Sequence, residues 1–194
     1  MGYDNIALFD LDGTLADYDK AMRRDLDALA EPNEKIYPLY GPGIPDYIEE
    51  RMDQIKRQPG WWSNLEKYPP GFEILRVCLD MGYKIHILTH GPLSKAFAWK
   101  EKVEWFHQHI IPVVPNADIT ITRDKGLVYG KVLVDDYPPY MERWLKNRPR
   151  GLGVMPVNDL NKLFSHPNVI KYDGTNLELV VQNLRQAYDR KPVR

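Results

Sequence analysis

Residues 6–14 read Ile-Ala-Leu-Phe-Asp-Leu-Asp-Gly-Thr, an apolar run followed at once by two carboxylates. The apolar run predicts a buried strand, and Gly13 allows a sharp turn beyond it. Side chains two apart in extended chain point the same way, so Asp10 and Asp12 leave the strand together. Open parallel sheets bind ligands at the carboxyl ends of their strands, so this pair marks a candidate site. For this stretch alone, an acidic turn without function is the alternative.

Outside this stretch, short apolar runs alternate with amphipathic segments along the chain. This alternation predicts an α/β fold, a Rossmann-like parallel sheet covered by helices. The expected strands cover residues 6–9, 84–88, 119–122, 132–134, 152–155 and 169–172. The expected helix faces are Ile74, Leu75, Cys78 and Leu79, ended by Gly82; Leu93, Ala96, Phe97, Val103, Phe106 and Ile110; and Leu177, Val180, Val181, Leu184 and Tyr188.

One connection is much longer than a parallel crossover requires. A crossover needs about a dozen residues, whereas 17–70 separate the first strand from the next helix. Helical patterns at 20–30 and 46–56 flank a loop rich in Pro and Gly. We therefore expect a small helical cap over 17–70, inserted into an α/β core formed by 1–16 and 71–194.

A second acidic pair follows the predicted strand at 132–134. Asp135 and Asp136 close that strand at the same edge of the sheet as Asp10 and Asp12. If the two strands are neighbours, up to four carboxylates converge, and an all-oxygen ligand set suits Mg²⁺. A solvated acidic turn is the alternative, but two acidic pairs that each close an apolar strand make it the weaker one.

Two further segments supply candidate phosphate ligands. Thr89 and His90 follow the strand predicted at 84–88, where we expect a helix to begin, and helix N-termini bind phosphate. Helix capping is the alternative role of Thr89. Lys125 follows the strand predicted at 119–122 and would supply a cation to the same edge, although an isolated lysine is usually a solvated surface charge.

Composition excludes several functional classes. The chain of 194 residues carries 26 Lys and Arg against 27 Asp and Glu, so no overall field favours long nucleic acids or an anionic membrane. Its single cysteine, Cys78, excludes a disulfide framework. No apolar run approaches the ~20 residues of a membrane span. We expect a cytoplasmic protein, and the sequence leaves its oligomeric state open, a homodimer included.

Together these segments resemble the four motifs of the haloacid dehalogenase superfamily of phosphotransferases. The motif residues are Asp10, Asp12, Thr89, Lys125 and the pair Asp135 and Asp136, in the order and spacing of that superfamily. The resemblance extends over residues 5–172. It implies a Rossmann-like core with a cap inserted after the first motif, where residues 17–70 lie.

Within that superfamily, the sequence more closely resembles the 5'(3')-deoxyribonucleotidases. The similar segments are 15–18, 59–62, 101–105 and 121–125. The resemblance implies that Tyr18, Trp61 and Trp62 enclose a nucleobase; packing of the cap on the core is their alternative role. The sequence departs from the pattern at His90, where a small polar residue is usual, and at Leu93, where a basic residue is frequent. Protonated His90 could donate to phosphate or narrow the site toward another phosphomonoester.

The resemblance also implies a mechanism. Asp10 would be the nucleophile that forms an aspartyl-phosphate, and Asp12 the acid and then the base. Mg²⁺ would bridge Asp10, the backbone carbonyl of Asp12, and either Asp135 or Asp136, with Asp136 favoured. Thr89 and Lys125 would hold the phosphoryl oxygens.

The predicted function is hydrolysis of a small phosphomonoester, a nucleoside monophosphate and preferentially a deoxynucleotide. A phosphatase for sugar phosphates or nucleic-acid ends, and a non-catalytic nucleotide-binding module, are the alternatives.

Overall fold

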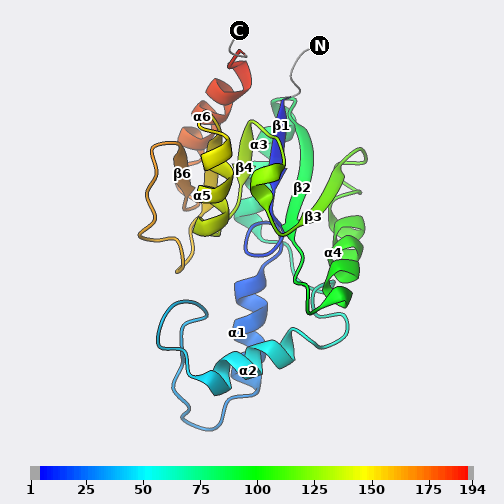
Figure 1. The fold of residues 1–194 in the computed structure, drawn as a ribbon, viewed down its shortest axis with the longest axis vertical. Coiled ribbons are helices and arrows are strands. Elements are labelled where there is room, and N and C mark those ends of the chain that lie inside the picture. Colours follow the sequence, from blue (N-terminus) through cyan, green and yellow to red (C-terminus); the bar gives the residue numbers. More distant parts are fainter. Residues whose placement is uncertain (1–4, 192–194) are drawn as a thin grey trace.

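The computed structural model describes residues 5–191, which form an α/β fold around one six-stranded sheet (Figure 1). All neighbouring strands are parallel, in the order β3-β2-β1-β4-β5-β6. The strands are β1 (Ile6–Phe9), β2 (Lys84–His90), β3 (Asp118–Thr122), β4 (Val132–Val134), β5 (Leu152–Pro156) and β6 (Val169–Tyr172). The predicted fold class is confirmed, and every predicted strand is present, three of them with the expected bounds.

Helices cover both faces of the sheet. They are α1 (Tyr18–Ala28), α2 (Asp46–Ile55), α3 (Pro69–Asp80), α4 (Ala96–His109), α5 (Pro138–Asn147) and α6 (Leu177–Asp189), with a short 3₁₀ turn, η1 (Lys125–Leu127). Alternate strand residues point to opposite faces. Ala7 and Phe9 belong to the core shared with α3 and α6, whereas Leu8 packs with Met141 and Trp144 of α5.

Helices α1 and α2 lie beyond the carboxyl ends of the strands, below the sheet in Figure 1. Asp17 caps α1 by accepting a hydrogen bond from Lys20 N (3.2 Å), so the helix begins at Tyr18, two residues before the predicted start. The apolar side of α1 is Ala21, Met22 and Leu26, all buried. Two helices, α1 and α2, thus follow β1 before the core helix α3, and the bounds 17–70 of a cap stay a prediction. The first four and last three residues of the predicted core lie outside the described residues.

Helix α4 departs most from the predicted pattern. Leu93 precedes the helix and is 70% exposed, and Phe97 is 37% exposed, although both were expected on the buried face. Glu101 and Lys102 are buried instead. Apolar periodicity misses this face because charged side chains occupy it for a local reason described below. A similar but smaller error occurs in α6, where Val181 is 36% exposed.

Within the described residues, no helix combines the length and the apolar character that crossing a membrane requires. Cys78 is buried on α3 without a disulfide, in agreement with its predicted role in the core.

Candidate active site

The order of the strands brings the two acidic pairs together. The chain runs from β1 outward through β2 and β3, then returns to β4 on the other side of β1. A crevice forms outside the carboxyl ends of two such strands, because their connections leave in opposite directions. Asp10 N donates to Val134 O (2.9 Å), so Asp10 and the residue after Val134 leave the sheet side by side. The predicted adjacency of the acidic strands is therefore correct.

Three carboxylates form a cluster at this crevice. Asp10, Asp135 and Asp136 each offer an oxygen within 4.8 Å of the others, and all three are buried. Burial, followed by Asp135 and Asp10, raises the pKa of Asp136 well above its ordinary value. Burial likewise raises the pKa of Asp135, to about 6, although Lys125 opposes this rise.

The charges at the site suit a divalent cation. Asp10, Asp12, Asp135 and Asp136 are four carboxylates, and the two buried ammonium groups beside them belong to Lys102 and Lys125. Full ionisation leaves two formal negative charges in a poorly solvated cluster. A divalent cation with a preference for oxygen ligands would neutralise that excess, so these residues fit such an ion.

Lys125 lies inside this cluster, not on the surface. Its Nζ is 2.8 Å from Asp10 Oδ1 and 2.6 Å from Asp135 Oδ2, and the residue is 1% exposed. Burial alone would lower the pKa of Lys125, but the two carboxylates raise it overall. The ammonium group is therefore charged at neutral pH, and it lies directly beside the candidate nucleophile.

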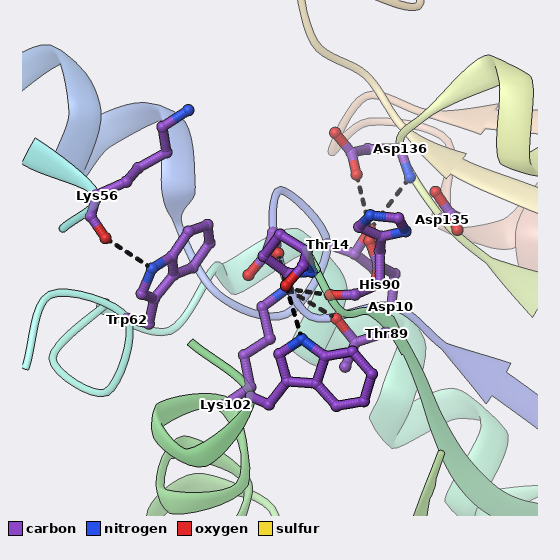
Figure 2. A network of polar contacts seen from close by, with 12 residues as sticks. Asp10, Thr14, Lys56, Trp62, Thr89, His90, Lys102, Asp135 and Asp136 are labelled. Carbon is purple, nitrogen blue, oxygen red and sulfur yellow. Dashed lines mark hydrogen bonds and ion pairs between the residues drawn. The ribbon is translucent and has the colours of Figure 1, made fainter. Parts of the chain in front are cut away.

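The two residues of the second acidic pair differ in their partners. Asp135 accepts from Lys125 Nζ and from Tyr137 N (2.9 Å), so one cation already compensates it. Asp136 accepts from Thr14 Oγ1 (3.3 Å) and Asn158 Nδ2 (2.8 Å), both neutral donors. Among the described residues, Asp136 thus has hydrogen bonds but no ion pair. Figure 2 shows both carboxylates beside Asp10 and Thr14.

A second buried lysine, which the sequence reasoning missed, holds Asp12. Lys102 Nζ contacts Asp12 Oδ2 and donates to Thr89 Oγ1 (3.2 Å) and His90 O (2.8 Å) (Figure 2). It also lies 4.9 Å from the centroid of a Trp62 ring. Burial raises the pKa of Asp12, Lys102 lowers it and Asp10 raises it, with a net rise. A carboxyl group that binds a proton more readily than usual is suited to general acid chemistry.

Thr89 and His90 reach the site from the end of β2, and not from a helix N-terminus. Strand β2 continues to His90 and α4 begins only at Ala96, so the predicted local geometry is wrong. Pro92 disfavours helical conformation in the preceding residue. Gly91 is also required there, because a Cβ at that position would overlap the ring of Trp99. Thr89 is nevertheless fully buried beside Lys102, at the site edge where it was expected.

His90 faces the cavity as a neutral side chain. Burial, and then Lys102 and Lys125, lower its pKa, so at pH 7 the imidazole is uncharged. Its ring stacks on Tyr140 with centroids 5.4 Å apart and an interplanar angle of 21°. Burial and the two lysines thus favour the neutral form here, and donation from a protonated His90 to phosphate stays a prediction.

A cavity of about 190 Å³ opens above these groups. Its lining combines carboxylates with aromatic side chains: Asp10, Asp12, Tyr18, Tyr40, His90, Asp136, Tyr137, Tyr140 and Leu160. Tyr18 was predicted to contact substrate, whereas the other three tyrosines were missed. The sequence carried a signal for two of them, since Tyr137 directly follows the second acidic pair and Tyr140 lies three positions further on.

Trp61 and Trp62 do not line this cavity. They are 8% and 7% exposed, and both indole nitrogens have partners: Trp61 Nε1 donates to Asp25 Oδ2 (2.8 Å) and Trp62 Nε1 to Lys56 O (3.1 Å). Glu101 holds their loop by accepting from Gly60 N (2.8 Å) and Trp62 N (3.0 Å). Tyr18 packs on both rings, with centroids 5.4 and 6.0 Å away. In this structure the two tryptophans pack against Tyr18, which lines the cavity, and do not line it themselves.

The fold is that of a haloacid dehalogenase-like hydrolase. A hydrolase of that type from Xanthomonas campestris aligns with a TM-score of 0.53 and 14% identity over 98% of this chain and 100% of its own. A second, from Burkholderia xenovorans, aligns with a TM-score of 0.54 and 19% identity over 94% of this chain and 99% of its own. At these identities the similarity establishes the fold and nothing finer.

Sequence comparison identifies the family. The family model described as 5' nucleotidase, deoxy (pyrimidine), cytosolic type C protein matches residues 4–165, and the chain belongs to that family. The human cytosolic-type 5'(3')-deoxyribonucleotidase is 29% identical over 141 residues, which cover 66% of this chain and 69% of the human one. A Chlorobaculum tepidum protein that provisionally carries the 5'(3')-deoxyribonucleotidase name is 30% identical over 74% of this chain and 73% of its own. The protein is therefore a phosphoric monoester hydrolase.

Proposed function

We propose that the protein hydrolyses nucleoside monophosphates, with a preference for deoxynucleotides, and requires Mg²⁺. The observation that carries this proposal is the convergence of Asp10, Asp12 and Asp136 with Lys125 and Thr89 at the crevice between β1 and β4. The names of the relatives support the choice of substrate.

In this proposal Asp10 is the nucleophile. One of its carboxylate oxygens attacks phosphorus, the bond from phosphorus to the ester oxygen breaks, and an aspartyl-phosphate forms. Lys125, 2.8 Å from Asp10 Oδ1, and the hydroxyl of Thr89 hold the phosphoryl oxygens as charge redistributes. Because Lys125 is preorganised by Asp135, little rearrangement is needed when the substrate arrives.

Asp12 handles the proton in both halves of the reaction. It donates its proton to the leaving alkoxide, and it then takes one from the water that hydrolyses the aspartyl-phosphate. Its raised pKa favours the protonated form needed in the first half, and its contact with Lys102 favours the ionised form needed in the second.

Asp10, the backbone carbonyl of Asp12 and Asp136 would hold the Mg²⁺. When bound, the ion supplies charge neutralisation for the phosphoryl group and the carboxylates. We assign Asp136 over Asp135 as the direct ligand because Lys125 already neutralises Asp135.

Residues 17–70 would act as the cap that selects the leaving group. Tyr18 of α1 and Tyr40 line the cavity, and Tyr40 OH contacts Asp19. A tyrosine face can stack on a nucleobase, which is worth ~1–3 kcal/mol and tolerates different bases. We place Tyr18 as the stacking residue and assign Trp61 and Trp62 to its support.

A phosphate-release assay with a panel of deoxynucleoside and ribonucleoside monophosphates, with Mg²⁺ and with EDTA, tests this function. Turnover of deoxynucleotides only with Mg²⁺ is the expected result. Asp10→Asn should lower kcat by at least ~10³-fold while circular dichroism stays unchanged. Activity retained in that variant contradicts the assignment of the nucleophile, and no turnover of any nucleotide contradicts the assignment of the substrate.

A phosphatase that prefers a small sugar phosphate is the second candidate. The cavity of about 190 Å³ is smaller than the ~300–1,000 Å³ of most small-molecule sites, and packing explains the two tryptophans without a base. Pentose and hexose phosphates therefore belong in the same panel, and a higher kcat/KM for one of them would favour this candidate.

A further inference from the structure

A second cavity lies at the amino edge of the sheet, at the other end of the strands from Asp10. Its volume is about 300 Å³, and it adjoins the starts of two strands, since Lys131 precedes β4 and Gly151 precedes β5. Residues at the ends of α5 and α6, which lie toward the top of Figure 1, complete its lining. Nothing in the proposed hydrolysis uses this cavity.

The lining of this cavity is strongly basic. Five of its residues are cationic and none is acidic: Lys131, Arg148, Arg150, Arg190 and Lys191. None of the five forms an ion pair with any carboxylate in the described part of the chain. The protein as a whole is nearly neutral, with a formal charge of −1, so this concentration of positive charge is local.

Backbone carbonyls, not carboxylates, accept from three of these cations, Lys131, Arg148 and Arg150. Lys131 Nζ donates to Tyr188 O (2.8 Å) and Arg190 O (3.0 Å), and Arg150 Nη2 donates to Lys191 O (3.2 Å). Carbonyl groups orient the side chains but leave their charge uncompensated. Burial, and then Arg190, lower the pKa of Lys131, with Asp189 as the opposing carboxylate and Arg150 acting with Arg190.

Arg148 adds a further cation to this lining. Its Nη1 donates to Asn147 O (3.0 Å), but its Nε is buried without a hydrogen-bond partner in residues 5–191. The Arg148 guanidinium lies 5.7 Å from the ring centroid of Tyr129, and that tyrosine is 41% exposed.

We propose that this cavity binds a nucleotide that carries several phosphates, such as a nucleoside triphosphate. The basic side chains would hold the phosphates, since Arg and Lys pair strongly with phosphate oxygens. The volume equals that of about ten waters at ~30 Å³ each, more than one phosphate fills, and Tyr129 offers a face for the base. The ligand is thus a different molecule from the monophosphate substrate and binds at a different site.

Isothermal titration calorimetry of the full chain in EDTA, which prevents metal-dependent turnover, tests this proposal. The probes are ATP, inorganic tripolyphosphate and adenosine. ATP should bind saturably and more tightly than tripolyphosphate, while adenosine alone should bind weakly. Equal affinity for ATP and tripolyphosphate contradicts a role for Tyr129, and absence of saturable ATP binding at millimolar concentration contradicts the site.

Charge reversal locates the binding. The double variant Arg150→Glu/Arg190→Glu should weaken ATP binding by at least ~10-fold, because each lost phosphate contact is charge-assisted. The matched control is Arg185→Glu on the exposed side of α6, which should bind as the unaltered protein does. Tyr129→Ala should weaken ATP but not tripolyphosphate and keeps the proposal testable if the double variant unfolds. Unchanged ATP affinity in a folded double variant would overturn the proposal, as would tighter binding of a single-stranded oligonucleotide.

The same titration separates this proposal from the proposed hydrolysis. Asp10→Asn removes the candidate nucleophile at the opposite edge and should leave ATP affinity unchanged. Loss of ATP binding in that variant would place the bound ATP in the catalytic cavity and overturn the second site, while hydrolysis is judged independently by phosphate release.

Discussion

Lys102 Nζ contacts the carboxylate of Asp12 although 90 positions of sequence separate the two residues. The lysine reaches the site from the buried face of α4, and the same ammonium group also donates to Thr89 Oγ1 and His90 O. It therefore links Asp12, the candidate general acid in the turn after β1, to Thr89, the candidate phosphate ligand in β2. Burial of a cation is costly unless it is paired. The buried position of Lys102 therefore depends on its ion pair with Asp12.

Replacement of this lysine should affect turnover more than binding. In Lys102→Met, Asp12 loses its cationic neighbour, stays protonated and cannot accept the proton from water. We expect kcat to fall by ~10–100-fold, with a smaller change in KM, measured by phosphate release. Lys100→Met is the matched control, because Lys100 lies on the same helix with its side chain 79% exposed, and Glu104 is its one ion-pair partner among residues 5–191. An equal loss in both variants would contradict a specific role.

Helix α4 also contains the two buried charged residues, Glu101 and Lys102, that the sequence did not predict. Strand positions were predictable because β1, β4 and β6 coincide with short apolar runs. The acidic pairs could be placed at one edge of the sheet because each directly follows such a run, and the carboxyl ends of parallel strands lie at the same edge. The helix at α4 was also expected, but part of its buried face was not, because Glu101 and Lys102 lie on that face and periodicity counts only apolar residues. Their partners are a loop backbone and Asp12, which become neighbours only after folding.

Stability without metal should depend on pH through the acidic cluster. Folding raises the pKa of Asp135 from about 3.8 in the unfolded chain to about 6, and it raises the pKa of Asp136 well above its ordinary value. The folded state then binds more protons, so this contribution is complete below pH ~4 and is lost as pH rises through 6. In EDTA, the melting temperature of Asp136→Asn relative to the unaltered protein should increase between pH 5 and pH 8.

Added Mg²⁺ should make the unaltered protein more stable than Asp136→Asn at neutral pH. The unaltered protein should gain ~2–3 kcal/mol at a concentration near 100 Kd, whereas Asp136→Asn should gain little. Asp80→Asn, an exposed position at the end of α3, controls for the loss of one charge and should follow the unaltered protein in both conditions. A constant difference across pH and metal concentration would contradict the assignment of Asp136 as the direct ligand.

Substitutions at Tyr18 and Trp62 should separate base recognition from packing. Tyr18 lines the cavity, so Tyr18→Ala should raise KM for deoxynucleotides by about tenfold and leave KM for a small phosphomonoester nearly unchanged. Trp62 is 7% exposed and packs against Tyr18, so Trp62→Ala should lower the free energy of unfolding by ~3–5 kcal/mol. Steady-state kinetics and urea unfolding measure the two effects. If Trp62→Ala instead raised KM for deoxynucleotides and left the free energy of unfolding unchanged, Trp62 would contact the base, and its assignment to packing would be wrong.

The tryptophans also mark a limit of inference from resemblance. Their presence and approximate place next to the site were predictable, because the 59–62 segment matches the family pattern. The conformation of one loop decides whether the tryptophan rings line the cavity or pack against Tyr18. Glu101 holds that loop by accepting hydrogen bonds from Gly60 N and Trp62 N. Only the folded chain determines that contact.

Gly13 offers a test of the acidic site that does not alter any charge. Its φ is +72°, and a Cβ there would overlap the carboxylate of Asp136, with 2.7 Å to Cγ. Gly13→Ala should therefore displace Asp136 and abolish Mg²⁺-dependent turnover. Gly41→Ala is the control, since Gly41 has a φ of +91° but no atom within 4 Å of the new Cβ. Both variants carry the ~1–2 kcal/mol of left-handed backbone strain, so a difference in Mg²⁺ affinity between them reports displacement of the carboxylate alone. If both retain the same affinity, measured by calorimetry, Asp136 does not hold the ion.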